Sequence, residues 1–397
     1  MKQIFTSFLL FIFSLFTSQD FIDFNTVVKD GSKFSYRSGN YLENIAIDSN
    51  ENVFMCGVYE EKIGFNMFDD TNFHLVYPNK DFSKSSFLVK YDKNKQYQWY
   101  KTISFSEGER GGASMTSIAI DKNDNVFVTG IAYGYNIDLY SSDDSSKIYN
   151  QDKYIEGIFL LKFSKDGELL LEQFYENAVG IPQVALDSKN NIYLSGTTIN
   201  YNGVKTDFNP NSDVYNSDAP DMSIFILKLD KDGEFKWVKY IDGHNGAQIG
   251  RFQFDSKDNL VFSGINEYYF DYNGEYRSTI SVNLVDRGNY IGKIDPNGRL
   301  LWLQALRGAS GTFVGSNTAD FCIGCDDSIV VFTSKNKREV TFPNYTYYPN
   351  NTYGIVLFKL SADGEYIWHT YLDPIKNGQD ILFGKSIFID KDFTINF

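Results

Sequence analysis

IAIDKNDNVFVTG, residues 118–130, is the stretch that decides the fold, because versions of it recur along almost the whole chain. A second stretch follows each copy and resembles FILKLDKDGEFKW, residues 225–237. The aspartate of the first stretch stands at Asp48, Asp121, Asp187, Asp255 and Asp390, with Gly324 in the same column. Successive copies are therefore 66 to 73 residues apart. A fixed period of this size predicts a repeat architecture in which each unit buries the face of its neighbour.

Each copy of the paired motif predicts four antiparallel strands. Two apolar runs flank a D-x-x-x-N turn in the first stretch, and Asp-Gly or Asn-Gly separates two more in most copies of the second. Asp and Asn bond their own backbone and tolerate left-handed conformations, so both turns indicate β-hairpins. The strands are apolar on nearly every residue, so both faces of each sheet are expected to be covered. We therefore predict an all-β fold, a β-propeller built of four-stranded blades.

The paired motif resembles the β-propeller repeats of the SBBP type, which occur in secreted and surface proteins. The resemblance covers about residues 24–397 and rests on D-x-x-x-N-[VIL]-[FYV]-[VLMF]-x-G followed by F-[LI]-x-K-[LFY]-[DS]-x-[DN]-G-x-[LFY]-x-W. That family shares no catalytic site, so the resemblance implies a fold and little about activity. Gly324 departs from the Asp column, Leu171 from the Trp column and Lys95 from the turn glycine.

The two ends of the chain are expected to complete one blade. Residues 386–397 match only the first hairpin of the motif, and residues 24–36 match only the second, with Asp30-Gly31 at its turn. Five whole blades and one split blade make six, closed by N-terminal strands that pair with C-terminal ones. Such closure would remove exposed sheet edges. The alternative is a chain that lacks a seventh blade.

Residues 1–19 have the layout of a secretory signal peptide. Lys2 precedes an apolar stretch, residues 4–16, which is followed by small polar residues. The stretch is too short to span a bilayer comfortably, but an uncleaved signal anchor is the alternative because a small-x-small cleavage pattern is missing. We expect residues 20–397 to form one propeller domain that is secreted or exposed on the cell surface.

Charge and cysteine content narrow the classes of partner. The net charge of −14 argues against nucleic acid, whose phosphates would be repelled, and favours cations, basic partners or simple solubility. Three cysteines, Cys56, Cys322 and Cys325, are too few for a disulfide framework and are expected to be buried free thiols. No cofactor is expected. No metal site is expected either, because the Asp column lacks the glycine and the distal glutamate of a calcium loop.

The candidate binding surface is the end of the sheets that carries the long loops. Within a blade, both hairpin turns lie at one end, while the middle loop and the link to the next blade lie at the other. Loops on a rigid scaffold commonly carry function, and the middle loops are rich in Tyr, Phe, Asp and Asn. Their aromatic side chains could stack on a sugar, anchor a protein partner or cap the ends of the blades. The candidates are Phe73, Tyr77, Tyr133, Tyr135, Tyr268, Tyr269 and Tyr272.

Catalytic constellations are sparse. The chain has 3 histidines and lacks an HExxH, P-loop or dinucleotide-binding motif. His244, in a Gly-rich link between blades, is a weak catalytic candidate, and His369 beside Trp368 is expected to be structural. Two sequons, at Asn344 and Asn350, fit glycosylation in a secretory path.

The sequence therefore favours a non-catalytic interaction module that binds a protein or glycan through its long-loop end. One alternative is a polysaccharide hydrolase or lyase with its active site at the mouth of the propeller. A second alternative is a structural surface-coat protein. Carboxylates converging on His244 in a deep mouth would favour the enzyme, and a shallow aromatic patch would favour binding.

Overall fold

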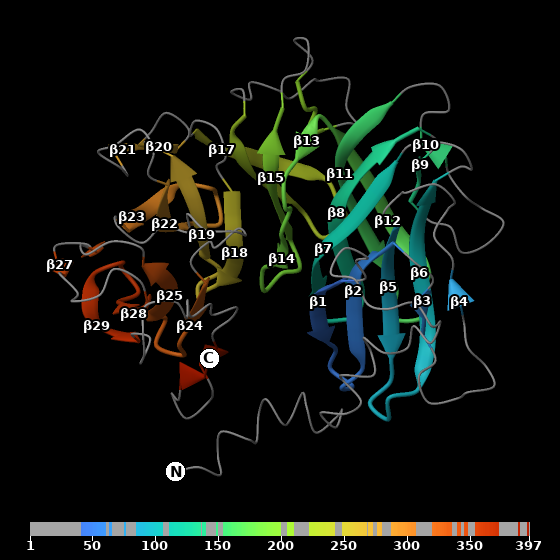
Figure 1. Ribbon diagram of the computed structural model, residues 1–397, viewed down its shortest axis with the longest axis horizontal. Helices are drawn as coiled ribbons and strands as arrows, with labels where there is room; N and C mark the ends of the chain where they lie inside the picture. The colour runs from blue at the N-terminus through green and yellow to red at the C-terminus, as the bar shows by residue number, and fades with distance from the viewer. Residues whose placement is uncertain are drawn as a thin grey trace. The chain divides into compact units, whose positions relative to one another are not determined.

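The computed structural model describes an all-β chain (Figure 1). The described ranges are 41–60, 63–65, 75–76, 85–105, 111–135, 137–139, 148–149, 154–199, 205–209, 222–242, 248–267, 269–272, 276–279, 287–306, 320–335, 340–342, 345–347, 354–372, 388–389 and 395–396. Within these ranges every regular element is a β-strand. No described segment forms a helix with the length and hydropathy needed to cross a bilayer. The chain divides into two compact units, Met1–Leu186 and Asp187–Phe397.

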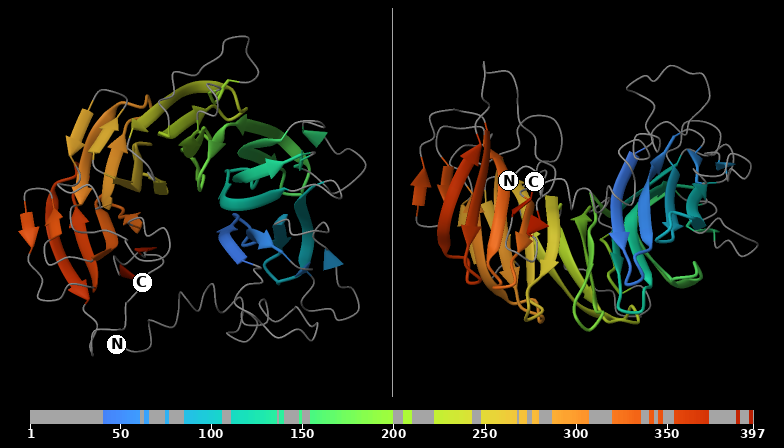
Figure 2. Two further views of the ribbon diagram at one scale, coloured as in Figure 1. Left: turned by 45° about the horizontal axis from the view of Figure 1, so that its top comes forward. Right: turned by 90° about the horizontal axis from the view of Figure 1, so that it is seen from below.

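The first unit contains a six-stranded antiparallel sheet, whose first four strands we call the first blade, and a four-stranded antiparallel sheet, the second blade (Figure 2). The first blade has the order β1 (Tyr41–Ile47), β2 (Val53–Tyr59), β5 (Ser85–Tyr91) and β6 (Tyr97–Phe105). The second blade comprises β7 (Gly112–Ile120), β8 (Val126–Gly134), β11 (Ile155–Phe163) and β12 (Leu169–Glu176). The short strands of this unit are β3 (Ile63–Gly64), β4 (Leu75–Val76), β9 (Ile137–Asp138), β10 (Ile148–Tyr149), β13 (Ala178–Val179) and β14 (Val184–Leu186).

The second unit holds the remaining repeats. Its first sheet includes β15 (Ile192–Thr198), β16 (Ile224–Leu229) and β17 (Phe235–Asp242), which belong to the third blade. The fourth blade is β18 (Gln248–Phe254), β19 (Leu260–Glu267), β22 (Arg287–Ile294) and β23 (Leu300–Leu306). The fifth blade is β24 (Asp320–Ile323), β25 (Ile329–Lys335), β28 (Gly354–Leu360) and β29 (Tyr366–Leu372). The short strands are β20 (Tyr269–Tyr272), β21 (Tyr276–Thr279), β26 (Val340–Phe342), β27 (Tyr345–Tyr347), β30 (Phe388–Ile389) and β31 (Ile395–Asn396).

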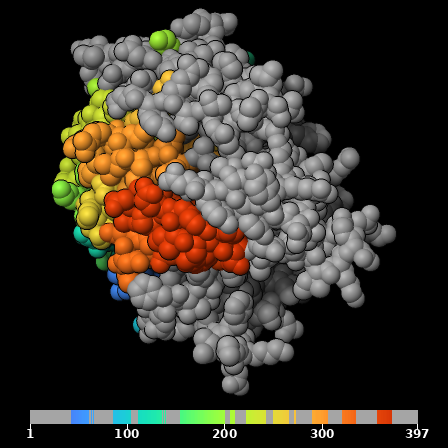
Figure 3. Space-filling model, turned by 90° about the vertical axis from the view of Figure 1, so that its left-hand side faces the viewer, coloured from blue at the N-terminus to red at the C-terminus, as the bar shows by residue number. Residues whose placement is uncertain are grey.

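The predicted hairpins and the predicted fold class are confirmed. Successive four-stranded antiparallel sheets of this kind are the blades of a β-propeller. Every residue of β2 and of β5 is buried, as the uninterrupted apolar runs predict for strands covered on both faces. The outer strands are more open, with Leu301 on β23 40% exposed and Ile367 on β29 48% exposed. Figure 3 shows the surface of the fourth and fifth blades, in orange and red, where these strands lie.

The sixth blade is only partly described. The C-terminal strands β30 and β31 form an antiparallel hairpin, as predicted for residues 386–397, and β30 lies next to β24 of the fifth blade. The N-terminal residues 24–36, and the signal-peptide segment 1–19, lie outside the described residues. Closure of a sixth blade therefore stays a prediction.

The three cysteines are free thiols, but they do not share one environment. Cys56 and Cys322 are buried, as predicted, and burial raises the pKa of Cys322 to about 12. Cys325 is exposed on the turn after β24, so the expectation of a buried thiol is wrong there. The second cysteine of the run FCIGC already belongs to the polar turn rather than to the strand.

Candidate functional site

The aspartates of the repeated motif shape turns. Asp121 Oδ1 accepts hydrogen bonds from the backbone N–H groups of Asn123 and Asn125, both at 2.9 Å, and Oδ2 accepts one from the Asn125 side-chain amide. The same three bonds occur at Asp48, Asp187 and Asp255. The described residues contain no group of three or more His, Cys, Asp or Glu side chains that could hold a metal ion. These carboxylates therefore form Asx turns that shape the hairpins.

A lysine of the second motif stretch lies beside each of these aspartates. The Nζ to Oδ2 distances are 3.9 Å for Lys90–Asp48, 3.6 Å for Lys162–Asp121, 3.7 Å for Lys228–Asp187 and 3.0 Å for Lys293–Asp255. The side chains are largely buried, so each pair places a cation where a buried carboxylate needs one. The sequence signal for this pairing is the lysine that recurs in the second motif stretch. The sequence alone does not predict its role as the partner of the aspartate.

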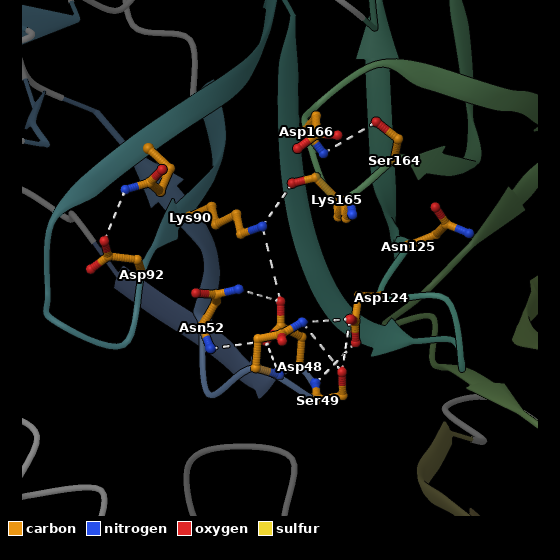
Figure 4. A network of polar contacts seen from close by, with 12 residues as sticks. Asp48, Ser49, Asn52, Lys90, Asp92, Asp124, Asn125, Ser164, Lys165 and Asp166 are labelled. Carbon is orange, nitrogen blue, oxygen red and sulfur yellow. Dashed lines mark hydrogen bonds and ion pairs between the residues drawn. The ribbon is translucent and has the colours of Figure 1, made fainter.

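The same lysines, with the motif tryptophans, clamp one blade to the next. In the first unit, Lys90 Nζ and Trp99 Nε1 both donate to the backbone carbonyl of Lys165, at 2.7 and 3.1 Å. Figure 4 shows Lys90 between Asp48 and that carbonyl. In the second unit, the equivalent contacts join Lys228 and Trp237 to Pro296, and Lys293 and Trp302 to Ala362. The repeated Asp, Lys and Trp columns thus form the scaffold.

Several of the long middle loops are anchored to the sheets, because each of them buries a large side chain in the core. The residues at the equivalent place in four of these loops are almost completely buried: Phe65, Leu139, Phe208 and Tyr272. Phe65 stacks on Tyr100 with ring centroids 5.0 Å apart. The signal that could have found them is a short recurring pattern, GFN at 64–66, DFN at 207–209 and DYN at 271–273.

Tyr272 therefore corrects one sequence prediction. Its ring has no exposed surface, and its hydroxyl donates to the carbonyl of Gly298 at 2.7 Å. It caps the edge of the sheet and is not part of a binding surface. Tyr269 lies on β20, but only its backbone is described. Six further candidates lie outside the described residues: Phe73, Tyr77, Tyr268, His244, Asn344 and Asn350.

The remaining two candidates, Tyr133 and Tyr135, lie together at the loop end of the second blade. The ladder between β8 and β11 pairs Tyr133 with Glu156 and, one step before, Gly134 with Ile155. Tyr133 and Glu156 are directly opposite each other and therefore share a face of this sheet, and Tyr135 and Tyr154 lie just beyond the ends of β8 and β11. The rings of Tyr135 and Tyr154 meet edge to face with centroids 5.6 Å apart. We call these four residues the tyrosine patch.

The tyrosine patch rests on a rigid base. Two residues further into the sheet, the same face carries the register row Ile131, Ile158 and Tyr175, of which the last two are completely buried. The Tyr175 hydroxyl donates to Gln173 Oε1 at 2.6 Å, which fixes that ring. Beside the patch, Gly112 makes room for Tyr133, because a Cβ there would lie 2.5 Å from the tyrosine hydroxyl. The Tyr133 ring is therefore packed against the sheet before any ligand arrives.

The patch is open to solvent and contains one acidic group. Tyr154 is 46% exposed, and Tyr133, Tyr135 and Glu156 are half-buried. Burial raises the pKa of the Glu156 carboxyl above its usual value. Tyr154 and Glu156 are not among the sequence-predicted residues. They could have been found only by pairing the two ends of the middle loop, where Y-x-Y at 133–135 faces Y-x-E at 154–156.

His369 behaves as the sequence predicts. Its Nδ1 lies 2.6 Å from the hydroxyl of Tyr366, three residues earlier on the same strand, and burial lowers the pKa of the imidazole. This local contact gives it a structural role at the outer strand β29.

Comparison of the sequence with a curated viral protein agrees with the fold. No protein-family model matches the chain. The sequence is similar to the uncharacterized WD repeat-containing protein L264 of Acanthamoeba polyphaga mimivirus, with 24% identity over 333 residues. The match covers 68% of this chain and only 23% of the viral protein. A crystal structure of a protein of unknown function from Bacteroides caccae aligns with 86% of this chain and 85% of its own, at 9% identity and a TM-score of 0.36. The chain is thus a β-propeller protein whose sequence is distantly similar to part of the viral protein.

Proposed function

We propose that this chain is a non-catalytic binding module and that its ligand docks on the tyrosine patch. The observation that carries the proposal is the combination of exposed aromatic rings with a fixed base. Tyrosine rings offer a large contact area at low cost in side-chain entropy, and their hydroxyls add hydrogen bonds. A site whose rings are already positioned loses less entropy when it binds.

The wider setting of this function is part of the same proposal. The signal-peptide layout of residues 1–19 supports secretion or display at the cell surface, with residues 20–397 forming one domain. The sequons at Asn344 and Asn350 support glycosylation along that path. The SBBP-type motif supports membership of that repeat family. Ligands of such a module are proteins or glycans.

A binding array tests the proposal. The full chain is applied to arrays of glycans and of surface-protein peptides, with hydrolysis of the bound material monitored in parallel. The double variant Tyr135→Ala/Tyr154→Ala removes the two rings that meet edge to face and is expected to lose binding at least tenfold. Leu170→Ala is the matched control, since Leu170 is a 51% exposed apolar residue on the outer strand of the same blade. Its binding is expected to equal that of the unmodified chain.

Two results would contradict the proposal. Unchanged binding by the folded double variant would move the site elsewhere on the molecule. Hydrolysis of a bound polysaccharide would favour the enzyme in place of the binding module. Melting temperatures of both variants, measured by differential scanning fluorimetry, separate loss of the site from loss of the fold.

A further inference from the structure

The position of Glu156 sets the chemistry of the ligand. In the ladder between β8 and β11, the residue directly opposite Glu156 is Tyr133. In the fourth blade, the corresponding pair in the ladder between β19 and β22 is Glu267 and Arg287. At this step of the ladder the fourth blade pairs a glutamate with a basic residue, whereas the second blade pairs a glutamate with an aromatic residue. A half-buried carboxylate gains most from a ligand that carries positive charge.

The rings around Glu156 favour the same kind of ligand. The face of an aromatic ring carries partial negative charge, so a cation within about 6 Å of its centroid is attracted. Cross-strand neighbours have Cβ atoms about 5 Å apart, so Tyr133 and Glu156 are adjacent on this face of the sheet, with the Tyr133 ring extending over Gly112 of β7. The net charge of the whole chain is −14, and this field draws cationic partners toward the surface.

Among cationic side chains, arginine fits this arrangement best. Its guanidinium is planar, so it can lie on a tyrosine ring and donate two parallel hydrogen bonds to one carboxylate. It is also more weakly hydrated than the ammonium group of lysine, and therefore loses less on entering a half-buried site. A neutral sugar could use the rings but would leave the carboxylate charge uncompensated.

We propose that the tyrosine patch binds the side chain of an arginine presented by a basic protein partner. This inference rests on the proposed function and names its ligand class. The guanidinium donates to the carboxylate of Glu156 and lies against the rings of Tyr133, Tyr135 and Tyr154. The partner is thus a protein with an exposed arginine, and a glycan is the competing outcome of the test.

Peptide titrations of the full chain, followed by ligand-observed NMR at low ionic strength, test the inference. The probes are the peptide acetyl-Gly-Gly-Arg-Gly-Gly-amide and two counterparts with lysine or with citrulline, the neutral isostere of arginine, at the centre. The arginine peptide is expected to bind at least tenfold more tightly than the citrulline peptide and more tightly than the lysine peptide. Glu156→Gln is expected to weaken arginine binding at least tenfold.

Glu168→Gln is the matched control, because Glu168 is an exposed glutamate in the turn between β11 and β12, at the opposite end of β11 from Glu156. It removes the same charge from the chain and is expected to leave the affinity within twofold. Equal affinity for the citrulline peptide, or an unchanged affinity of Glu156→Gln, would overturn the inference.

The outcomes also separate this inference from the proposed function. If a glycan binds in a manner that needs Tyr135 and Tyr154 while the arginine peptide does not bind, the ligand class is wrong and the binding module stands. If the loss of both rings changes no binding to the arrays or the peptides, both proposals fail. Melting temperatures of Glu156→Gln and Glu168→Gln establish that each variant is folded.

Discussion

Gly364 lies directly against the indole ring of Trp302: a Cβ atom at this glycine would be 2.7 Å from the ring atom Cδ2. The glycine has φ +82°, in the left-handed region. Equivalent contacts join Gly167 to Trp99 and Gly298 to Trp237. The tryptophan of one blade and the turn glycine of the next blade are therefore a single packing contact, repeated along the chain.

This contact predicts the effect of adding one methyl group. Gly364→Ala combines left-handed strain with a clash against Trp302, and we expect it to lower the free energy of unfolding by about 2–4 kcal/mol. The measurement is urea denaturation followed by tryptophan fluorescence. Lys95→Gly is the control at the equivalent turn of the first blade, where φ is 66° without a glycine. That change is expected to be neutral or stabilising by up to about 1 kcal/mol, because glycine adopts this φ without strain. A loss of less than about 0.5 kcal/mol in Gly364→Ala would contradict the contact.

The fifth blade predicts a compensated pair. Asp326 lies 3.5 Å from Lys359 and accepts a backbone hydrogen bond from Ser328, so it takes over the task of the aspartate that Gly324 replaces. A Cβ at Gly324 would be 2.7 Å from the Asp326 carboxylate, which shows that the two side chains compete for one place. We expect Asp326→Ala to cost about 1–2 kcal/mol, the lower part of the range for charged hydrogen bonds because Asp326 is half-exposed.

A double-mutant cycle measures this compensation. Gly324→Asp alone should destabilise the protein by crowding two carboxylates, whereas Gly324→Asp/Asp326→Ala should restore the usual turn. The expected coupling is about 1 kcal/mol in favour of the double variant, measured by urea denaturation. Additive effects of the two changes would show that Asp326 does not substitute for the missing aspartate.

The contact between the first two blades predicts sensitivity to acid. The Asp124 carboxylate accepts hydrogen bonds from the Ser49 backbone N–H at 2.9 Å and from the Ser49 hydroxyl at 2.8 Å. These bonds lower the pKa of Asp124 from its usual value of 3.8. A lowered pKa stabilises the folded state above the unfolded value and loses this contribution as pH falls through the folded value. Asp124→Asn should therefore be less stable than the unmodified chain at pH 7 by about 1–2 kcal/mol, with the difference shrinking below about pH 4.

Asn tolerates the left-handed conformation of Asp124, whose φ is 62°, so the substitution tests the charge and not the backbone. Asp166→Asn, in an exposed turn of the second blade, is the matched control and should show no such pH dependence. Thermal unfolding between pH 3 and pH 8 provides the measurement. An equal pH profile for the two variants would contradict the role of Asp124.

Glu156 predicts the opposite sign. Because burial raises the pKa of this carboxyl above 4.5, its contribution to stability is fully present below that unfolded value and is lost as pH rises through the folded value. Glu156→Gln should therefore melt at a higher temperature than the unmodified chain at pH 7 and at the same temperature near pH 4. Glu168→Gln should match the unmodified chain at both values. A lower melting temperature of Glu156→Gln at pH 7 would show that the carboxylate is structural instead of a group retained for binding at a cost in stability.

Local patterns predicted the hairpins well, because each turn and its flanking strands are specified by residues that are close together in the sequence. Asp121 and Asn125, for example, sit four apart and bond to each other directly. Features that depend on pairing between distant strands could not be predicted in this way. The burial of Tyr272 follows from the pairing of β20 with β17, and the meeting of Tyr133 with Glu156 follows from the register of β8 and β11. Neither relationship is visible until the register is known.

The middle-loop strands have a consequence for how this chain can be cut and rebuilt. β9, which follows β8 of the second blade, pairs with β6 of the first blade, and β20, which follows β19 of the fourth blade, pairs with β17 of the third. The outer edge of a sheet is therefore finished by residues of the following repeat. A segment excised or duplicated at motif boundaries carries an unfinished edge, and grafts should instead run from one middle loop to the next. The same overlap means that, as the chain leaves the ribosome, the first sheet gains its last partner strand only after the second has begun to form.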